Sequence, residues 1–338
     1  MVPHEIRNGS SISKIVLFYF FAAIFLMPFE QIQAAENVRH EKVIKAEEIQ
    51  RNIYSSAILK EGTYILVGDR GMILRSQDRG STWNEISTES IVPLFSVTFS
   101  GSQKGWISGL NGLILHSGDR GLNWSKQQTN CEKHLFAIDF LNDQIGCAVG
   151  DWGTILVTQD GGHTWEDVSL PDDIILYDIK FSDEREGQGW IVGEMGHIFK
   201  TLDYGSTWEE VSTTQPLGAT LFCLDVKESL IYCAGLEGKV VFSKDGGQNW
   251  EYGMSASEEP IYDLACSEDV CLAVGAAGMF QIKNGLHWKI EESPERYKLF
   301  WIADLSMQAN DRLKYDGFGV GADGLFFEVE DNLPLWGK

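Results

Sequence analysis

Basic residues are scarce in this chain of 338 residues, which has 27 lysines and arginines against 49 aspartates and glutamates and a formal net charge of −22. The first 35 residues contain two bases, Arg7 and Lys14, and two acids, Glu5 and Glu30, so the remainder keeps all of this net charge. Such a surface argues against nucleic acid as a partner and against an anionic membrane face. We expect a charged partner to be basic or metal-bound. Part of the acidity serves solubility.

Metal-site spacings and catalytic carboxylate pairs are absent from the sequence as well. No cysteine and histidine spacing is typical of a zinc site, and no two carboxylates stand out as an acid–base pair. We therefore expect no metal, no cofactor and no catalytic residue. After residue 35 there is no second long apolar run, so the mature chain is expected to be soluble.

Residues 1–35 have the layout of a secretory signal peptide. Two basic residues precede the thirteen apolar residues 15–27, and small residues follow at Ala34 and Ala35. Such a run is too short to span a bilayer comfortably, so we predict a signal peptide that is cleaved near Ala34 or Ala35. An uncleaved anchor is the alternative. No cysteine stands at the cleavage point, which argues against a lipoprotein. Export to the periplasm follows, or to the lumen if the organism is photosynthetic.

An eight-residue box recurs through the rest of the chain, with a hydroxyl, an acid, a glycine and a tryptophan at fixed spacing. Its copies are SQDRGSTW (76–83), SGDRGLNW (117–124), TQDGGHTW (158–165), TLDYGSTW (201–208) and SKDGGQNW (243–250). A sixth copy, QIKNGLHW (281–288), keeps Gly285 and Trp288 but lacks the acid and the hydroxyl. A repeat of this period indicates an array of equivalent structural units.

A second motif, G-x-x-G, runs in step with the box. It reads GDRG (68–71), GLNG (109–112), GDWG (150–153), GEMG (193–196), GLEG (235–238), GAAG (275–278) and GADG (321–324). The two central residues need tight-turn dihedrals, which Asp, Asn and Gly tolerate. Seven copies of this motif indicate seven units.

Each unit has the pattern of four short strands. In the third unit these are FAIDF (136–140), GCAVG (146–150), TILVT (154–158) and WEDVS (165–169). Period-two alternation bounded by Gly, Asp and Asn predicts strands and hairpins, and four strands in each repeat of this length are typical of a propeller blade. We predict an all-β, seven-bladed β-propeller with four-stranded antiparallel blades over residues 51–338.

The last blade lacks an obvious outer strand. Its first three strands are expected near WIADL (301–305), DGFGVG (316–321) and LFFEVE (325–330). Because an open ring would expose a sheet edge, we predict that either the N-terminal segment 36–50 or the tail LPLW (333–336) completes this blade.

The box has a structural interpretation. Its Asp can accept hydrogen bonds from backbone N–H groups of its own turn, its Ser or Thr can tie the turn to the preceding strand, and its Gly supplies an unusual dihedral. Its Trp can bury a large ring between blades. A catalytic group is not normally needed five times, so the boxes are not expected to form an active site.

These motifs resemble the Asp-box, or bacterial neuraminidase repeat. Together with the G-W-x-V-G pattern, they resemble the photosystem II stability and assembly factor family over roughly residues 50 to 330. The resemblance implies a non-enzymatic propeller that assists assembly of membrane protein complexes, hence a protein client that is a membrane protein or complex. The resemblance implies an arginine-rich patch in members from photosynthetic organisms, and no such patch can be mapped here, which weakens the transfer of their specific partner and leaves the fold unaffected.

A glycoside hydrolase or a carbohydrate-binding propeller of the sialidase type is the alternative function. A sialidase needs an arginine cluster and a Tyr nucleophile with an acidic partner. The usual Arg-Ile-Pro opening is absent, and Arg79 and Arg120 occupy box turns, away from where such a cluster would converge. The binding-scaffold hypothesis is therefore favoured over the enzyme.

A scaffold needs a surface, and we expect it on the face where the G-x-x-G turns emerge, since propellers bind partners with loops on a rigid frame. Candidate partner-binding residues at these turns are Trp152, Asp151, Glu194, Arg70, Asp69, Glu237 and Asp323. A Trp at a turn tip is not required by turn chemistry, and rigid aromatics often anchor interfaces. For the acids, ordinary turn chemistry is the alternative.

The inner strands carry aspartates in five blades, at Asp139, Asp178, Asp225, Asp263 and Asp304. If they point into the central channel, they form a negative funnel that could hold water, a cation or a basic peptide. The alternative is that each carboxylate binds backbone N–H groups at the channel edge.

All six cysteines lie after residue 35, where an oxidising compartment would permit disulfides. Cys223 and Cys233 are expected to lie nearly opposite on adjacent strands, as are Cys266 and Cys271. Both pairs are predicted as disulfides, and six small buried thiols are the alternative.

Overall fold

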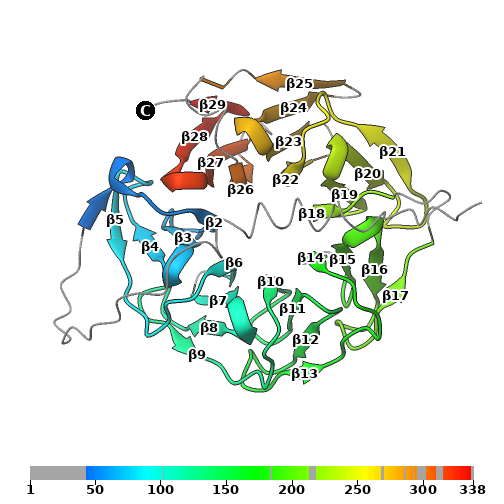
Figure 1. Ribbon diagram of the computed structural model, residues 1–338, viewed down its shortest axis with the longest axis horizontal. Helices are drawn as coiled ribbons and strands as arrows, with labels where there is room; N and C mark the ends of the chain where they lie inside the picture. Colours follow the sequence, from blue (N-terminus) through cyan, green and yellow to red (C-terminus); the bar gives the residue numbers. More distant parts are fainter. Residues whose placement is uncertain are drawn as a thin grey trace, which may run out of the picture. The chain divides into compact units, whose positions relative to one another are not determined.

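The computed structural model describes residues 43–335, except 102, 183–184, 213–217, 268–269, 285–286, 292, 295–301 and 310–314. The predicted signal peptide at residues 1–35 lies outside this part, as does the beginning of the segment 36–50. The compact unit Glu41–Lys338 consists of seven sheets around a common axis (Figure 1). This arrangement confirms the seven-bladed propeller with antiparallel blades.

Each blade runs outward from the axis in sequence order. The first three blades are β2 (Ile53–Ile58), β3 (Tyr64–Gly68), β4 (Ile73–Ser76), β5 (Thr82–Glu85); β6 (Leu94–Ser100), β7 (Lys104–Gly109), β8 (Ile114–Ser117), β9 (Ser125–Lys126); β10 (Leu135–Phe140), β11 (Gly146–Gly150), β12 (Ile155–Thr158), β13 (Glu166–Asp167). The next two are β14 (Leu176–Phe181), β15 (Gly189–Gly193), β16 (Ile198–Thr201), β17 (Glu209–Glu210); β18 (Leu221–Lys227), β19 (Leu230–Gly235), β20 (Lys239–Ser243), β21 (Glu251–Met254). The last two are β22 (Ile261–Cys266), β23 (Val270–Gly275), β24 (Phe280–Asn284), β25 (His287–Glu291); β26 (Ile302–Ala309), β27 (Tyr315–Gly321), β28 (Phe326–Glu330), β29 (Leu333–Leu335).

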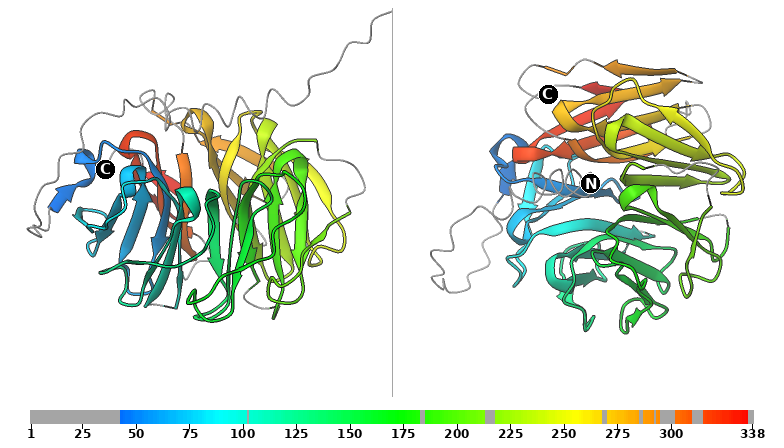
Figure 2. Two further views of the ribbon diagram at one scale, coloured as in Figure 1. Left: turned by 60° about the horizontal axis from the view of Figure 1, so that its bottom comes forward. Right: turned by 45° about the vertical axis from the view of Figure 1, so that its right-hand side comes forward.

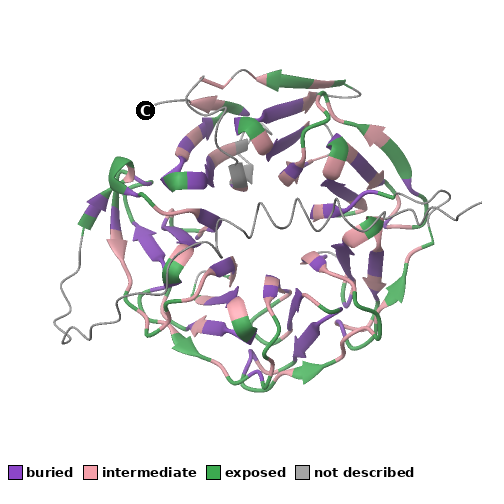
Figure 3. Cartoon of the chain, viewed as in Figure 1, coloured by how far each residue is buried: buried purple, intermediate pink, exposed green. Residues whose placement is uncertain are grey.

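The hydrophobic core lies between neighbouring blades rather than at the axis. In the first six blades the second strand is almost wholly buried, as in GCAVG of β11 and GWIVG of β15, while the outer strands β13 and β17 are exposed (Figure 3). A strand covered on both faces reads as a continuous apolar run, whereas a half-covered strand alternates. This explains why the second strands carry the weakest alternation in the sequence.

The two ends of the chain add strands to different blades. The tail strand β29 pairs with β28 and supplies the outer strand of the seventh blade. The N-terminal strand β1 (Val43–Lys45) pairs with β5 instead, as a fifth strand outside the first blade. Among the described residues, no strand is exchanged between the first and last blades, and side-chain contacts join them. Tyr64 and Phe318 pack across this junction with ring centroids 4.4 Å apart.

The first strand of every blade contains a β-bulge at its second residue. In β10, Leu135 pairs with Gly150 and Ala137 with Val149, so Phe136 is the extra residue. A bulge leaves one residue unpaired and can redirect its side chain. The same shift occurs in the other six inner strands, at Tyr54, Phe95, Tyr177, Phe222, Tyr262 and Ala303.

One of the two predicted disulfides is present and the other is not. Cys266 pairs directly with Cys271, and the two form a disulfide. The prediction for Cys223 and Cys233 is wrong, since Cys223 lies opposite Ala234 and both thiols are free and buried. A two-residue turn between Lys227 and Leu230 shifts the register by one residue, which places the two side chains on opposite faces of the sheet.

Candidate protein-binding face

The G-x-x-G turns and the connections between blades lie on one face of the ring, which we call the turn face (Figure 2). Each turn is held to the start of its own blade by a backbone hydrogen bond, for example from Asp69 N to Asn52 O at 3.1 Å and from Asp151 N to His134 O at 3.2 Å. The boxes and the turns between first and second strands lie on the opposite face, which we call the box face.

The two central positions of the G-x-x-G turn have different roles. Acids at the first central position point back to the blade. The Asp151 carboxylate accepts from His134 N at 2.8 Å, the Glu194 carboxylate from Ile175 N at 3.3 Å, and the Asp69 carboxylate from Asn52 N at 3.3 Å. Three of the seven candidate residues therefore hold the turn itself.

Side chains at the second central position stand away from the blade. In all seven turns this residue has a positive φ, between 51° and 58°, which is the left-handed region that non-glycine residues seldom occupy. These residues are Arg70, Asn111, Trp152, Met195, Glu237, Ala277 and Asp323. The sequence candidates Arg70, Trp152, Glu237 and Asp323 therefore form a ring of exposed turn tips.

Two apolar side chains stand out among the tips. Trp152 is 56 % exposed and Met195 is 69 % exposed. The Nζ atom of Lys133, from the connection before the third blade, lies 4.6 Å from the centroid of the Trp152 ring, a cation–π contact. Met195 was not among the sequence candidates. The signal that identifies it is its position in the turn, which it shares with Trp152.

The bulged residues form an arc of aromatic rings around the channel mouth, which we call the aromatic collar. It comprises Tyr54, Phe95, Phe136, Tyr177, Phe222 and Tyr262. Consecutive ring centroids are 5.8, 5.5, 6.2, 5.1 and 5.7 Å apart, in that order. Tyr54 and Phe95 are buried, and the other four rings are partly exposed. Sequence reasoning missed the collar, although an aromatic residue occupies the second position of six inner strands.

The five inner-strand aspartates bridge neighbouring blades. Each accepts a hydrogen bond from a backbone N–H on the first strand of the next blade. The bonds to Asp139, Asp178, Asp225 and Asp263 come from Phe181 N (2.8 Å), Leu224 N (2.9 Å), Cys266 N (2.7 Å) and Leu305 N (2.7 Å). Asp304 closes the ring by accepting from Ser56 N at 2.7 Å and from the Ser56 hydroxyl. Carboxylate binding to backbone amides is therefore the main role of these residues.

One base, Lys180, lies among these carboxylates. Burial lowers its pKa, but Asp139, Asp178, Asp263 and Asp225 raise it, so that the pKa ends above its ordinary range. Burial in turn raises the pKa of Asp178 and of Asp304 to about 6. Since one cation faces five acids, the channel keeps a negative balance while the carboxylates are ionised.

The boxes form closed hydrogen-bond sets on the box face. In the third box, the Asp160 carboxylate accepts from Thr164 N at 2.8 Å, from the Thr164 hydroxyl at 2.7 Å and from the Thr158 hydroxyl at 2.9 Å. Burial acts to raise the pKa of Asp160, but these hydrogen bonds outweigh it and the pKa is lowered. The same contacts recur around Asp78, Asp119, Asp203 and Asp245.

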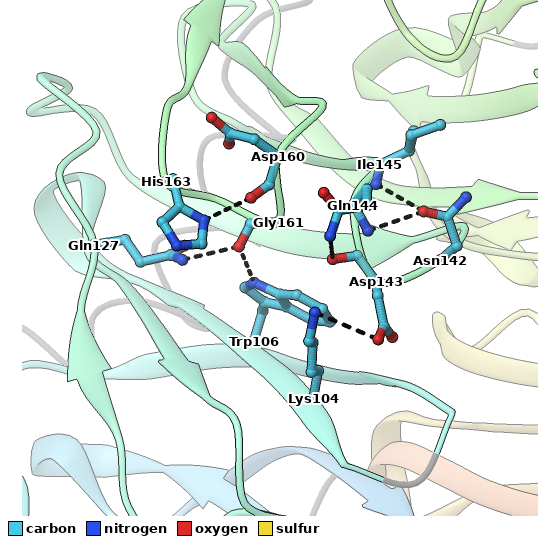
Figure 4. A network of polar contacts seen from close by, with 10 residues as sticks. All are labelled: Lys104, Trp106, Gln127, Asn142, Asp143, Gln144, Ile145, Asp160, Gly161 and His163. Atoms are coloured by element: carbon cyan, nitrogen blue, oxygen red, sulfur yellow. Dashed lines mark hydrogen bonds and ion pairs between the residues drawn. The ribbon is translucent and has the colours of Figure 1, made fainter.

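The third box also holds the second blade. Trp106 Nε1 and Gln127 Nε2 both donate to the Gly161 carbonyl at 3.1 Å (Figure 4). Gly161 N donates to Gln144 O at 2.8 Å within its own blade. The box therefore connects two blades through backbone groups, and its carboxylate has its oxygens engaged within the turn. This geometry supports the structural interpretation of the box.

The sequence matches the family described as "Photosynthesis system II assembly factor YCF48" over residues 34–131 and 163–260. The chain belongs to this family. No curated protein matches it significantly. Among solved structures, it is similar to YCF48 bound to a D1 peptide, with 20 % identity and a TM-score of 0.68 over 87 % of this chain and 98 % of that chain. YCF48 from Cyanidioschyzon merolae has 18 % identity and a TM-score of 0.65, over 83 % and 96 % of the two chains.

The fold is shared beyond the YCF48 family. The virginiamycin B lyase of Staphylococcus aureus, in selenomethionine-substituted form, has 8 % identity to this chain and a TM-score of 0.69, over 86 % of this chain and 98 % of that chain. Such a likeness shows the fold and no more, because one propeller fold supports both enzymes and binding proteins. The function of this chain is therefore inferred from the side chains on its turn face and its box face.

Within the described residues, no group of three or more His, Cys, Asp or Glu side chains is arranged to hold a metal ion. No helix in the same part of the chain is both long and apolar enough to cross a membrane.

Proposed function

We propose that this chain is an exported, non-enzymatic assembly factor of the YCF48 family, and that it binds a protein segment of a membrane protein complex on its turn face. Membership of the family supports the class of function. The observation that carries the location is the ring of turn tips, where Trp152 and Met195 expose large apolar side chains on rigid backbone. Aromatic anchors on rigid frames are typical of interfaces.

A peptide segment is the form of client that we favour. One structure similar to this chain is of YCF48 bound to a D1 peptide. A propeller face presents turns and connections on a rigid frame, and an extended chain can contact several of them at once. Candidate contacts are Trp152, Arg70, Glu237 and Asp323 at the tips. Asp69, Asp151 and Glu194 act through the shape of the turn that they hold.

The glycosidase alternative has less support. A retaining or inverting glycosidase needs two carboxylates facing one substrate. The box carboxylates face their own turns instead, with both oxygens of Asp160 occupied by Thr164 and Thr158. The five inner-strand aspartates are likewise engaged with backbone amides of the next blade.

Export is supported by the chemistry of the cysteines. A disulfide between Cys266 and Cys271 is expected to persist in an oxidising compartment and to be rare in the cytosol. Together with the predicted signal peptide at residues 1–35, this favours the periplasm, or the lumen in a photosynthetic organism.

Capture of the client by matched variants tests the proposal. Membranes are crosslinked in the presence of the tagged mature chain, and recovered subunits of membrane complexes are identified by mass spectrometry. Trp152→Ala should weaken capture by about 2 kcal/mol, roughly thirtyfold in Kd, as for an aromatic anchor. Leu202→Ala is the control, because Leu202 is 64 % exposed on the box face. Undiminished capture by Trp152→Ala would contradict the proposed face. Hydrolysis of sialosides or oligosaccharides by the purified chain would contradict the non-enzymatic function.

A further inference from the structure

The described turns and connections of the two faces differ in their balance of exposed charge. Exposed acids in the G-x-x-G turns and the described blade-to-blade connections are Glu89, Glu132, Asp172, Asp173, Glu237, Glu258, Glu259 and Asp323. Exposed bases in the same segments are Arg70 and Lys133. On the box face, the described boxes and first-to-second-strand turns expose the acids Glu61, Asp78, Asp143, Glu186 and Glu228 against the bases Lys60, Arg79, Arg120 and Lys244. Within these described segments, the turn face therefore carries the larger excess of acids over bases.

Apolar surface on the turn face accompanies this charge. Ile91, in the connection between the first and second blades, is 72 % exposed, in addition to Met195 and Trp152. The collar contributes the partly exposed rings of Phe136, Tyr177, Phe222 and Tyr262 at the channel mouth. The acidic residues therefore surround an aromatic centre, which is the arrangement of an interface with a polar rim.

Contacts on this face already show how it would accept a cation. The Lys133 ammonium stacks on the Trp152 ring. The attraction between an arginine or lysine and an aromatic ring becomes stronger when the cation is partly desolvated. An acidic rim also accelerates encounter with a positively charged partner and repels an acidic one.

We infer that the turn face docks an extended peptide segment in which lysine or arginine alternates with apolar side chains, with the segment lying across the aromatic collar and between the turn tips. This inference rests on the proposed function, since it specifies the chemistry of the client of that same face. The basic side chains meet the acidic rim, and the apolar side chains contact the collar together with Trp152 and Met195.

Two synthetic peptides with opposite charge test this inference. Both have about twelve residues, one with Lys-Leu-Gly repeats and the other with Glu-Leu-Gly repeats, and both have blocked termini and a fluorescent label. Anisotropy titrations of the full mature chain are run at about 150 mM salt, where long-range attraction is screened. The Lys peptide should bind at least about tenfold more tightly than the Glu peptide. Equal affinity, or tighter binding of the Glu peptide, would overturn the inference.

Paired charge reversals locate the binding. Glu132→Lys with Asp173→Lys changes two exposed acids of the turn face, and Glu166→Lys with Glu209→Lys changes two exposed acids of the outer strands by the same total charge. The first pair should raise the Kd of the Lys peptide about tenfold or more, and the second by less than about twofold. An equal loss in both pairs would mean that net charge alone attracts the peptide, and would overturn the docking face.

Removal of one collar ring tests the apolar centre. Phe222→Ala should weaken the Lys peptide at least about fivefold, whereas Phe242→Ala, which removes a partly buried ring of the same blade away from the collar, should not. If Phe222→Ala does not fold, Phe222→Leu keeps the apolar bulk without the aromatic face and should still weaken binding. No change with either Phe222 variant would exclude the collar.

Outcomes with the cellular client separate this inference from the proposed function. If wild type recovers a membrane-complex subunit and the Glu132→Lys, Asp173→Lys variant recovers it equally well, the docking chemistry is wrong and the scaffold function stands. If wild type recovers none, the scaffold function is wrong, and the peptide titrations still decide the chemistry of the face. A solution dimer that the same variant dissociates would assign the face to a second copy and overturn the inference.

Discussion

The turn face and the box face are built from equally regular turns, yet the side chains of the two faces are engaged in different ways. In the boxes, the conspicuous polar residues bind the turn itself and the neighbouring blade, as Asp160 binds Thr164 and Gly161 binds Trp106. In the G-x-x-G turns, one central residue holds the turn and the next points into solvent. A motif that repeats strictly therefore marks the stabilising face, and variable residues within a regular turn mark the face available to a partner.

The largest expected effect is a difference in stability between two variants, one at a buried tryptophan of the box and one at an exposed tryptophan of the turn face. Trp83 is fully buried and packs edge-on against Phe326 of the last blade, with ring centroids 5.7 Å apart. Trp83→Ala should lower the free energy of unfolding by about 3–5 kcal/mol, as for a large-to-small change in a core. Trp152→Ala should leave it within about 0.5 kcal/mol, as for an exposed surface position. Urea denaturation of the wild type and the two variants measures both values. Similar losses of stability in the two variants would contradict the distinction between the faces.

Removal of a box carboxylate is expected to cause a smaller loss of unfolding free energy. Asp160→Ala leaves Thr164 N and two hydroxyls without their acceptor, which should lower the free energy of unfolding by about 1–2 kcal/mol. Asp143→Ala, which removes an exposed ion pair with Lys104 of 3.4 Å on the same face, should cost at most about 0.5 kcal/mol. Client capture should survive both changes. A normal melting temperature with loss of capture in Asp160→Ala would place function in the box.

A charge reversal at the first central position of a G-x-x-G turn should destabilise the folded protein. The Asp151 carboxylate accepts from His134 N, so Asp151→Lys should lower the melting temperature, because a partly buried N–H loses its acceptor. The same reversal at the turn tip Asp323 should leave the melting temperature unchanged, since that residue points outward. Thermal unfolding of the two variants tests whether the two central positions differ as described. An equal response would contradict this difference.

The smallest expected effect is a dependence of stability on pH through the channel. Burial raises the pKa of Asp178 and of Asp304 from 3.8 to about 6, so the folded state binds more protons than the unfolded state between those values. Stability from these groups is therefore greatest near pH 4 and falls as the pH rises through 6. The box carboxylates have lowered pKa values, and their contribution is lost below about pH 4.

Asp178→Asn tests the contribution of the channel. It removes the titrating group but keeps an oxygen that can accept from Leu224 N. The melting temperature of wild type should rise between pH 7 and pH 5, and this rise should be smaller in the variant. An equal rise in both proteins would show that Asp178 does not titrate in this range.

The sequence was sufficient to predict seven blades with four antiparallel strands each, because both features follow from short-range patterns that repeat. The G-x-x-G and box motifs specify tight turns locally, and alternation predicts the strands between them. The role of the box carboxylates also followed from turn chemistry alone, and the contacts of Asp160 agree with it.

Register within a hairpin could not be predicted in the same way. Whether Cys223 and Cys233 lie opposite each other depends on whether the turn after Lys227 has two residues or three. A change of one residue in the register moves a side chain to the other face of the sheet. The bulge at the second residue of each inner strand has no sequence signature of its own, and it is this bulge that brings Phe136, Phe222 and their equivalents together. Contacts between distant repeats, such as Asp304 with Ser56, depend on closure of the whole ring.

Site-specific photocrosslinking tests the central claim, that the turn face binds the client while the box face holds the blades, most directly. A photoreactive phenylalanine derivative is placed at Met195 in one protein and at Leu202 in another, which are 69 % and 64 % exposed on opposite faces. After irradiation with membranes, we predict that the client is crosslinked through position 195 and recovered at least about tenfold less through position 202. Crosslinking of the client through position 202, or equally through both positions, would contradict the account.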